Sequence, residues 1–414
     1  SGKAGADFFL TKKSTLGFLV KGYVNDRNRN NTTITPAFDQ VDNQIIYVLE
    51  AGTVNDGIRQ NLNANINYTF DNGAGRILSL DADWGTFRSE NDTYQPNFYK
   101  TPDEAHITDE RIFTSQAPTD IDIYTFKFDY EQSALGGKLG AGAKISYVST
   151  DNTYDFYQLL NSEEILDIDR SNNFVFSENI NAAYLNYTRQ VSKYTLNFGI
   201  RAEQTNSTGT LRALKPTNND EVERHYLNLF PSAGISFQAD PKNQLRLNYS
   251  RRIDRPNYQD LNPFEFKISE LSYSRGNPFL RPQYTHSVSF AHTYNYRLTT
   301  SLTYSYTDDF FANISDSTEV SRTFLETINL DYQEVISLNI SYPFSPKEWW
   351  NTYTSLTGYH TRNRADLGEG RIVDIKATVA SIYHQSTFQL PKDFSFQLSG
   401  WFSSPSIWGA VYKT

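Results

Sequence analysis

Apolar and polar residues alternate at every second position, and this is the feature that most limits how the chain can fold. The alternation is clear in residues 61–70 (NLNANINYTF) and 298–306 (LTTSLTYSY), and similar segments recur along the whole sequence. Successive side chains of a β-strand point to opposite faces of the sheet. Such segments therefore predict strands that have one apolar and one polar face.

Two kinds of connection alternate between these segments. Short turn-forming groups lie at residues 11–13, 71–75, 133–137, 191–193, 240–243, 295–297, 345–347 and 391–393. Longer polar stretches cover residues 25–57, 87–119, 150–176, 206–224, 251–281, 307–333 and 361–371. The pattern predicts about 16 strands that are joined in turn by tight hairpins and long loops.

A soluble β-sandwich and a membrane barrel could both produce two-faced strands. The chain has 28 tyrosines and 28 phenylalanines but a mean hydropathy of -0.57. It contains no run of about 18 apolar residues, which excludes a transmembrane helix, whereas a membrane barrel needs only alternation over about ten residues. Strands of that length, joined by turns and long loops in strict alternation, are typical of bacterial outer-membrane barrels. We therefore predict an all-β fold, a transmembrane antiparallel β-barrel with short periplasmic turns and long extracellular loops.

The predicted barrel occupies residues 1–414 as one domain, and the soluble sandwich is the alternative. A barrel of this size is too wide for its own side chains to fill the lumen, so we expect water or a plug inside. The net charge of -9 and the lack of a basic stripe disfavour a nucleic-acid partner.

Residue types that carry catalysis or bind metals show no recognisable spacing. Cysteine is absent, which excludes disulfides and cysteine-based zinc sites. The six histidines lack metal-ligand spacing, and the acidic clusters lack the pattern of an EF-hand loop. No nucleophile elbow or P-loop is present. We expect a protein that is not an enzyme and that has no metal and no cofactor.

A dense group of charges forms the first candidate site. Arg251, Arg252, Asp254 and Arg255 lie at the end of a predicted strand, next to Pro256. The group could contact a ligand or a plug from the lumen or from a loop. Alternatively, the four charges pair with one another and fix the geometry of the loop, which is the interpretation that the sequence favours.

Aromatic residues among asparagines and aspartates form the second candidate site. Tyr94, Tyr99, Tyr154 and Tyr157 lie in the predicted loops. Aromatic faces next to amides suit sugars or peptides, and binding residues are concentrated on loops. The alternative is that these rings pack the loops against one another.

Several motifs resemble the barrel domain of TonB-dependent outer-membrane receptors. The motifs are residues 250–256 (SRRIDRP), 261–264 (LNPF) and 276–282 (GNPFLRP), supported by 199–203 (GIRAE), 230–237 (FPSAGISF) and 404–409 (SPSIWG). The branch that the chain resembles is the outer-membrane β-barrel family that usually follows a carboxypeptidase-regulatory-like domain and a plug. The similarity extends from about residue 181 onward.

The resemblance implies a bacterial outer-membrane receptor that imports a nutrient with energy from TonB. Its implied partners are outer-membrane lipid, the plug domain of the same protein, the TonB complex and a surface lipoprotein. The resemblance also implies about 22 strands, a TonB box and a terminal aromatic strand, which residues 409–414 (GAVYKT) lack. We therefore expect a fragment whose plug and terminal strands are absent. A passive porin and a structural or secretion-partner barrel are the alternative functions.

Overall fold

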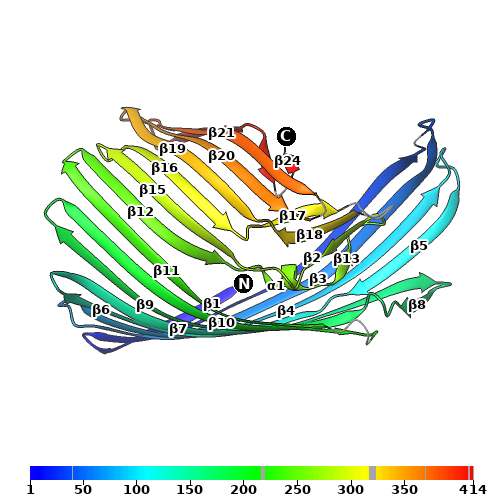
Figure 1. The fold of residues 1–414 in the computed structure, drawn as a ribbon, viewed down its shortest axis with the longest axis horizontal. Helices are drawn as coiled ribbons and strands as arrows, with labels where there is room; N and C mark the ends of the chain where they lie inside the picture. Colours follow the sequence, from blue (N-terminus) through cyan, green and yellow to red (C-terminus); the bar gives the residue numbers. More distant parts are fainter. Residues whose placement is uncertain (40, 216–219, 317–322, 369, 409–410, 414) are drawn as a thin grey trace.

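The computed structural model describes residues 1–39, 41–215, 220–316, 323–368, 370–408 and 411–413 (Figure 1). Its main sheet has 18 strands, of which β5 (Ile107–Gln116) and β8 (Glu163–Leu166) are short additions. The other 16 form one antiparallel meander in which each strand pairs with the next. The all-β, antiparallel fold that the alternation predicts is confirmed.

The wall is made of strands with the following bounds: β1 (Gly2–Thr11), β2 (Ser14–Phe38), β3 (Ile45–Asp71), β4 (Arg76–Lys100), β6 (Thr119–Ala134), β7 (Gly137–Leu160), β9 (Asn172–Val191), β10 (Tyr194–Ala213), β11 (Asp220–Asp240), β12 (Asn243–Asp254), β15 (Gln283–Tyr294), β16 (Leu298–Asp308), β19 (Tyr332–Lys347), β20 (Trp350–Asp366), β21 (Ile372–Gln389) and β22 (Ser395–Ser403). The sheet curves strongly, like the wall of a barrel (Figure 1). Among the described residues, no pairing joins β1 to β22. A short hairpin of β23 (Ser406–Trp408) and β24 (Val411–Lys413) follows the wall. Residues 409, 410 and 414 lie outside the described residues. They include the last position of the motif at 404–409 and three of the terminal residues 409–414.

Seven of the eight predicted tight turns connect neighbouring strands of the meander, whereas residues 345–347 belong to β19 and the turn that follows lies at residues 348–349. The turn between β6 and β7 has Leu135 at φ 54° and Gly136 at φ 74°, and the turn between β15 and β16 has Asn295 at 50° and Tyr296 at 56°. Two successive positive φ angles match the right-handed twist of the flanking strands. The turn chemistry therefore fixes the register of the hairpins.

Five of the seven predicted long loops are wrong in extent, because the strands continue through most of each range. These ranges are 25–57, 87–119, 150–176, 206–224 and 361–371. Residue 40 of the first, residues 216–219 of the fourth and residue 369 of the fifth lie outside the described part. Strand β3, for example, is 27 residues long. The alternation of apolar and polar residues ends where both faces of a strand contact water or are covered by protein. The backbone hydrogen bonds between strands do not depend on this alternation, so the strands continue. The sequence pattern therefore marks only the part of each strand whose one face is apolar.

The ranges 251–281 and 307–333, of which residues 317–322 lie outside the described part, leave the wall, and both contain short elements. The first holds α1 (Tyr258–Leu261), β13 (Glu265–Lys267) and β14 (Ser272–Arg275), and the second holds β17 (Phe311–Asp316) and β18 (Thr323–Asn329). Together the strands form a second sheet in the order β13-β14-β18-β17, with β14 parallel to β18. The pairing of β14 with β18 therefore joins the two excursions by backbone hydrogen bonds.

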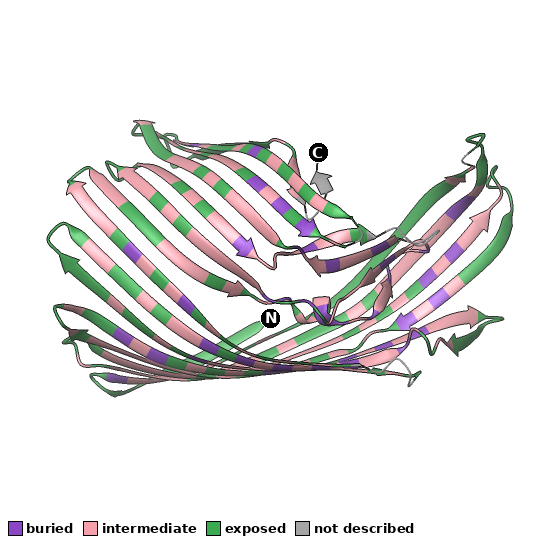
Figure 2. Ribbon diagram, in the orientation of Figure 1, coloured by how far each residue is buried: buried purple, intermediate pink, exposed green. Residues whose placement is uncertain are grey.

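The two faces of the wall differ in chemistry. Large apolar side chains such as Ile66, Phe126, Phe198, Phe290 and Leu338 are exposed on one face, and exposed and less exposed residues alternate along the strands (Figure 2). The first excursion packs on the opposite, concave face, where α1 lies inside the curve of the sheet (Figure 1). In the described part of the chain, no helix has the length and apolar character needed to cross a membrane.

Candidate functional site: the concave face and its inward-folded segment

Residues 255–282, which we call the inward-folded segment, leave the wall after β12 and return to it at β15. Local chemistry fixes the path of the segment. The Asn257 side chain caps α1 by accepting hydrogen bonds from the backbone N–H groups of Gln259 and Asp260. Gly276 approaches the backbone so closely that a Cβ there would lie 2.0 Å from the Asn262 carbonyl oxygen. Glycine is therefore required where the segment folds back on itself.

An aromatic cluster attaches this segment to the wall. Leu261, Phe264 and Leu280 are 5%, 1% and 0% exposed. The Tyr154 ring on β7 packs against Phe264 at a centroid distance of 5.9 Å and against Phe266 at 4.8 Å. The other buried members of the cluster come from β5, β7 and β9 and are Phe113, Phe156, Phe174 and Phe176. Burial of this many large side chains makes the segment a fixed part of the concave face.

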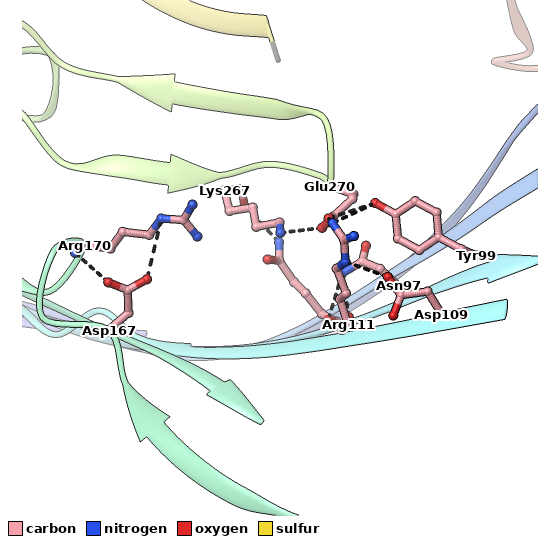
Figure 3. Close-up of polar contacts among 9 residues, drawn as sticks. Asn97, Tyr99, Asp109, Arg111, Asp167, Arg170, Lys267 and Glu270 are labelled. Carbon is pink, nitrogen blue, oxygen red and sulfur yellow. Dashed lines mark hydrogen bonds and ion pairs between the residues drawn. The ribbon is translucent and has the colours of Figure 1, made fainter. Parts of the chain in front are cut away.

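A buried ion pair, the Lys267–Glu270 anchor, attaches the same segment to β4 and β5 (Figure 3). The two side chains are 2% and 6% exposed. Glu270 Oε1 accepts a hydrogen bond from the Tyr99 hydroxyl at 3.0 Å and another from Arg111 Nη1 at 3.3 Å. The backbone carbonyl of Lys267 accepts one from Gln95 Nε2 at 2.9 Å. The anchor therefore joins the segment to the wall through polar atoms that have partners.

The Lys267 ammonium has an unusual environment. It lies 3.5 Å from the centroid of the Phe113 ring, in addition to its contact with Glu270. Burial lowers the pKa of Lys267 to about 8, although the hydrogen bond and the charge of Glu270 oppose the change. Nearby, Arg170 pairs with Asp167 and lies over the rings of Phe156 and Tyr273 at 5.2 and 5.7 Å. Cations on aromatic faces thus reinforce the aromatic cluster.

The four charges of the first candidate site have three different surroundings. Arg255 Nη2 donates to Glu203 Oε2 at 2.8 Å and to Thr205 Oγ1 at 3.0 Å, and Arg255 Nε lies 3.8 Å from Glu178 Oε1. Arg255 therefore ties the start of the segment to β9 and β10, through wall residues rather than through the neighbouring charges that the sequence suggested.

The backbone pairing of β11 with β12 ends at Ser250, and the Arg251 side chain lies between the two strands beyond that point. Its guanidinium lies between the rings of Phe230 and Tyr284, at 5.5 and 4.8 Å, and donates to the Leu229 carbonyl at 2.7 Å. Asp254 accepts a hydrogen bond from Gln283 Nε2 at 3.3 Å. Both side chains therefore hold the wall together.

Arg252 differs from the other three. It is exposed, and within the ranges that the structure describes it makes no ion pair and no side-chain hydrogen bond. It lines a cavity of about 650 Å³ on the concave face, between β9 and β16. Apart from Arg252, the polar side chains that line this cavity are uncharged: they are serines, threonines, asparagines and Tyr249.

The four candidate tyrosines do not form one site. Tyr99 and Tyr154 face the inward-folded segment, whereas Tyr94 and Tyr157 lie in β4 and β7 at positions of the opposite parity. All four lie in strands rather than loops. Tyr154 is 3% exposed and packs the inward-folded segment against the wall from β7, so its role is packing, but between a strand and a segment rather than between two loops.

The sequence analysis missed the residues of the anchor. Lys267 and Glu270 lie in an irregular stretch with no periodicity, and Arg111 and Gln95 come from regions that were expected to be loops. The contacts that join Lys267 and Glu270 to the wall come from residues 95, 99 and 111, which are distant in sequence, so no local signal identifies them. Among the described residues, no group of three or more histidines and carboxylates is placed to hold a metal ion.

A family model described as the outer membrane protein beta-barrel family matches residues 68–414. Among solved structures, the copper transporter OprC is 11% identical, with a TM-score of 0.48 and coverage of 97% of this chain and 71% of that chain. The ferric yersiniabactin uptake receptor FyuA from Yersinia pestis is 8% identical, with a TM-score of 0.44 and coverage of 99% and 70%. The siderophore receptor PiuA from Acinetobacter baumannii is 9% identical, with a TM-score of 0.43 and coverage of 96% and 76%. No curated protein matches the sequence.

Proposed function

Because this chain belongs to the outer membrane protein beta-barrel family, we propose that it forms the wall of a bacterial outer-membrane receptor that imports a nutrient. The ligand would be captured at the end of the wall opposite the tight turns, where barrels of this kind carry their long connections outside the cell. It would then pass along the concave face with energy supplied by the TonB complex.

The inward-folded segment is the observation that carries this proposal. It is anchored on the concave face by buried apolar and ionic contacts, so in the proposed barrel it would narrow the lumen on the side of β4 to β10. A wall with an exposed apolar face outside and a polar face inside suits a solute path through lipid. A fixed constriction at the outer end suits selection of the solute before it moves further.

The energised step is supported by the motifs in residues 250–256 and 276–282, which resemble TonB-dependent receptors. On that model, a plug domain of the same protein fills the remaining lumen, and TonB displaces it during uptake. Outer-membrane lipid surrounds the apolar face, and a surface lipoprotein is a further partner. We propose no catalytic role.

Growth of the native bacterium tests the proposal. Wild type, a deletion of this gene and a deletion of TonB would be compared on single nutrient sources, with the full-length protein restored from a plasmid as the control. We expect at least one nutrient on which each deletion abolishes growth. The plasmid should restore growth on this nutrient to the strain that lacks this gene, but not to the strain that lacks TonB. Growth that requires this protein but not TonB would instead establish a passive porin. Normal growth of the deletion strain on every source would favour a structural or secretion role.

A further inference from the structure

Arg252 lies next to side chains that can complete a binding site. It faces Thr285 directly across the β12–β15 pairing, and Ser250 and Ser287 form the next facing pair on the same side of the sheet. All four line the cavity of about 650 Å³. Among the described lining residues, Arg252 is the one that carries a charge. The cavity therefore combines a single cation with many groups that can donate or accept hydrogen bonds.

Two other arginines on this part of the concave face have an anionic partner, and a third, Arg246, donates to the Gln244 side chain. Arg201 Nε lies 2.5 Å from Glu203 Oε1, and Arg255 pairs with the same carboxylate. Asp254, two residues beyond Arg252 on its own strand, accepts a hydrogen bond from Gln283. Arg252 is thus free to bind an anion that is not part of the described wall.

We propose that Arg252, with Ser250, Thr285 and Ser287, forms a docking site for the carboxylate group of a hydroxyl-rich solute in the lumen. The guanidinium group presents two parallel N–H donors that match the two oxygens of a carboxylate. A phosphate carries a charge of about -1.5 to -2 near neutral pH, which one arginine would leave partly uncompensated. The serine, threonine and asparagine side chains would bind the hydroxyl groups of the solute.

The site rests on the proposed function, since it names the class of solute that moves along this wall. Arg252 is exposed, so each contact with the solute replaces a contact with water and binding is weak. Weak binding suits a site on a transport path, because a solute must leave it as readily as it enters. Loss of the guanidinium should weaken binding about tenfold, as expected for hydrogen bonds to a charged group.

A single introduced thiol can report on the site, because these 414 residues contain no cysteine. The full-length protein in outer-membrane vesicles would carry Ser250→Cys, with Ser289→Cys as a second reporter in the same cavity. The rates of reaction with an anionic and a cationic methanethiosulfonate reagent would be measured with Arg252 present and in Arg252→Gln. A positive charge about two residues away should favour the anionic reagent roughly fivefold, and Arg252→Gln should remove that preference.

Gluconate and its uncharged analogue sorbitol would then be used to protect the thiol. We expect gluconate to slow the modification and sorbitol to have little effect. Arg252→Gln should abolish the protection by gluconate, and Arg252→Lys should keep the charge preference but weaken the protection, because lysine lacks the planar fork. Ser337→Cys is the matched control: it lies on β19, and its facing residues Thr303 and Tyr359 are uncharged. Neither Arg252 substitution should change its ratio of rates.

Equal protection by gluconate and sorbitol, or full protection in Arg252→Gln, would overturn the proposal. So would a Ser250→Cys thiol that reacts with neither reagent while Ser337→Cys reacts with both, since a protein segment would then cover the site. Failure of the proposed uptake is a separate result: TonB-independent growth would remove the energised step but leave the protection by gluconate unchanged.

Discussion

Two regions of the concave face differ in how their polar side chains obtain partners. The covered region is the part of β4, β5, β7, β9 and β10 that lies under the inward-folded segment. The open region is the inner face of β12, β15 and β16. The wall strands of the covered region are long, with 25 residues in β4, 24 in β7 and 20 each in β9 and β10, and only the added strand β5 is short, with 10. In the open region β12, β15 and β16 have 12, 12 and 11.

The polar groups of the two regions differ in the same way. Under the segment, charged side chains such as Glu203 and Glu270 are buried, and each has a cationic partner. In the open region the inner residues are mainly serines and threonines such as Ser289 and Ser305, which are only partly buried. A buried charge needs a partner inside the protein, whereas an open hydroxyl can use water. Coverage by the segment therefore explains which residue types each region tolerates.

The largest expected effect comes from breaking the Lys267–Glu270 anchor. Lys267→Met leaves the buried Glu270 carboxylate without its ammonium partner and with Arg111 as its remaining cation, 3.3 Å away. The loss of docking free energy should reach about 3 kcal/mol, the lower end of the cost of breaking a buried pair. Hydrogen–deuterium exchange of residues 265–275 in the full-length protein would measure it as lost protection. The double variant Lys267→Met with Glu270→Leu should recover much of the protection, because no buried charge remains at either position.

A matched control for this experiment lies in the same segment. Glu265 and Arg275 form a more exposed pair at 3.9 Å, with side chains 35% and 37% exposed. Glu265→Gln should cost less than about 1 kcal/mol. If Glu265→Gln released the segment as fully as Lys267→Met did, burial would not be what distinguishes the covered region.

A smaller loss is expected where the segment begins. Arg255→Gln removes the charged hydrogen bond to Glu203, which keeps Arg201 as a partner, and leaves the Glu178 carboxylate next to Glu203 without its own cation. The cost should be about 1.5–3 kcal/mol. Exchange of residues 256–261 would report the loss. Lowering the pH toward about 5 should restore part of the protection in the variant, because protonation of one carboxylate relieves the repulsion. A loss of protection that did not respond to pH would argue against this repulsion.

The alternation of residues was sufficient to predict the strands, the hairpins and their order, because it records the contact of one face with an apolar surrounding. It failed beyond about residue 87 of β4 and residue 150 of β7, where both faces carry polar and aromatic residues. The features that continue these strands are pairings such as Tyr94 with Thr114 and Asp155 with Gln116. Backbone pairing of that kind leaves no periodic trace in the sequence.

The candidate charges illustrate the same limit at the level of the site. Residues 250–256 were recognisable as a dense charged group, but the different surroundings of Arg251, Arg252 and Arg255 depend on residues as distant as Glu178, which precedes Arg255 by 77 positions (255 − 178). Sequence could identify the group but could not assign a role to each member. The anchor is harder still, since Tyr99 and Glu270 are separated by 171 positions.

The smallest expected effect comes from the open region and tests the comparison from the other side. Replacing Ser287, Ser289 and Ser305 by alanine removes three hydroxyls, of which Ser305 and Ser287 are hydrogen-bonded to each other at 3.2 Å. Because water can replace these contacts, the triple variant should change the free energy of unfolding by less than about 0.5 kcal/mol per site and leave the protection of residues 265–275 unchanged. The heat-dependent gel shift of the folded protein and hydrogen–deuterium exchange would check both. A loss as large as that of Lys267→Met would mean that the hydroxyls are structural, and that the two regions do not differ in how they satisfy their polar groups.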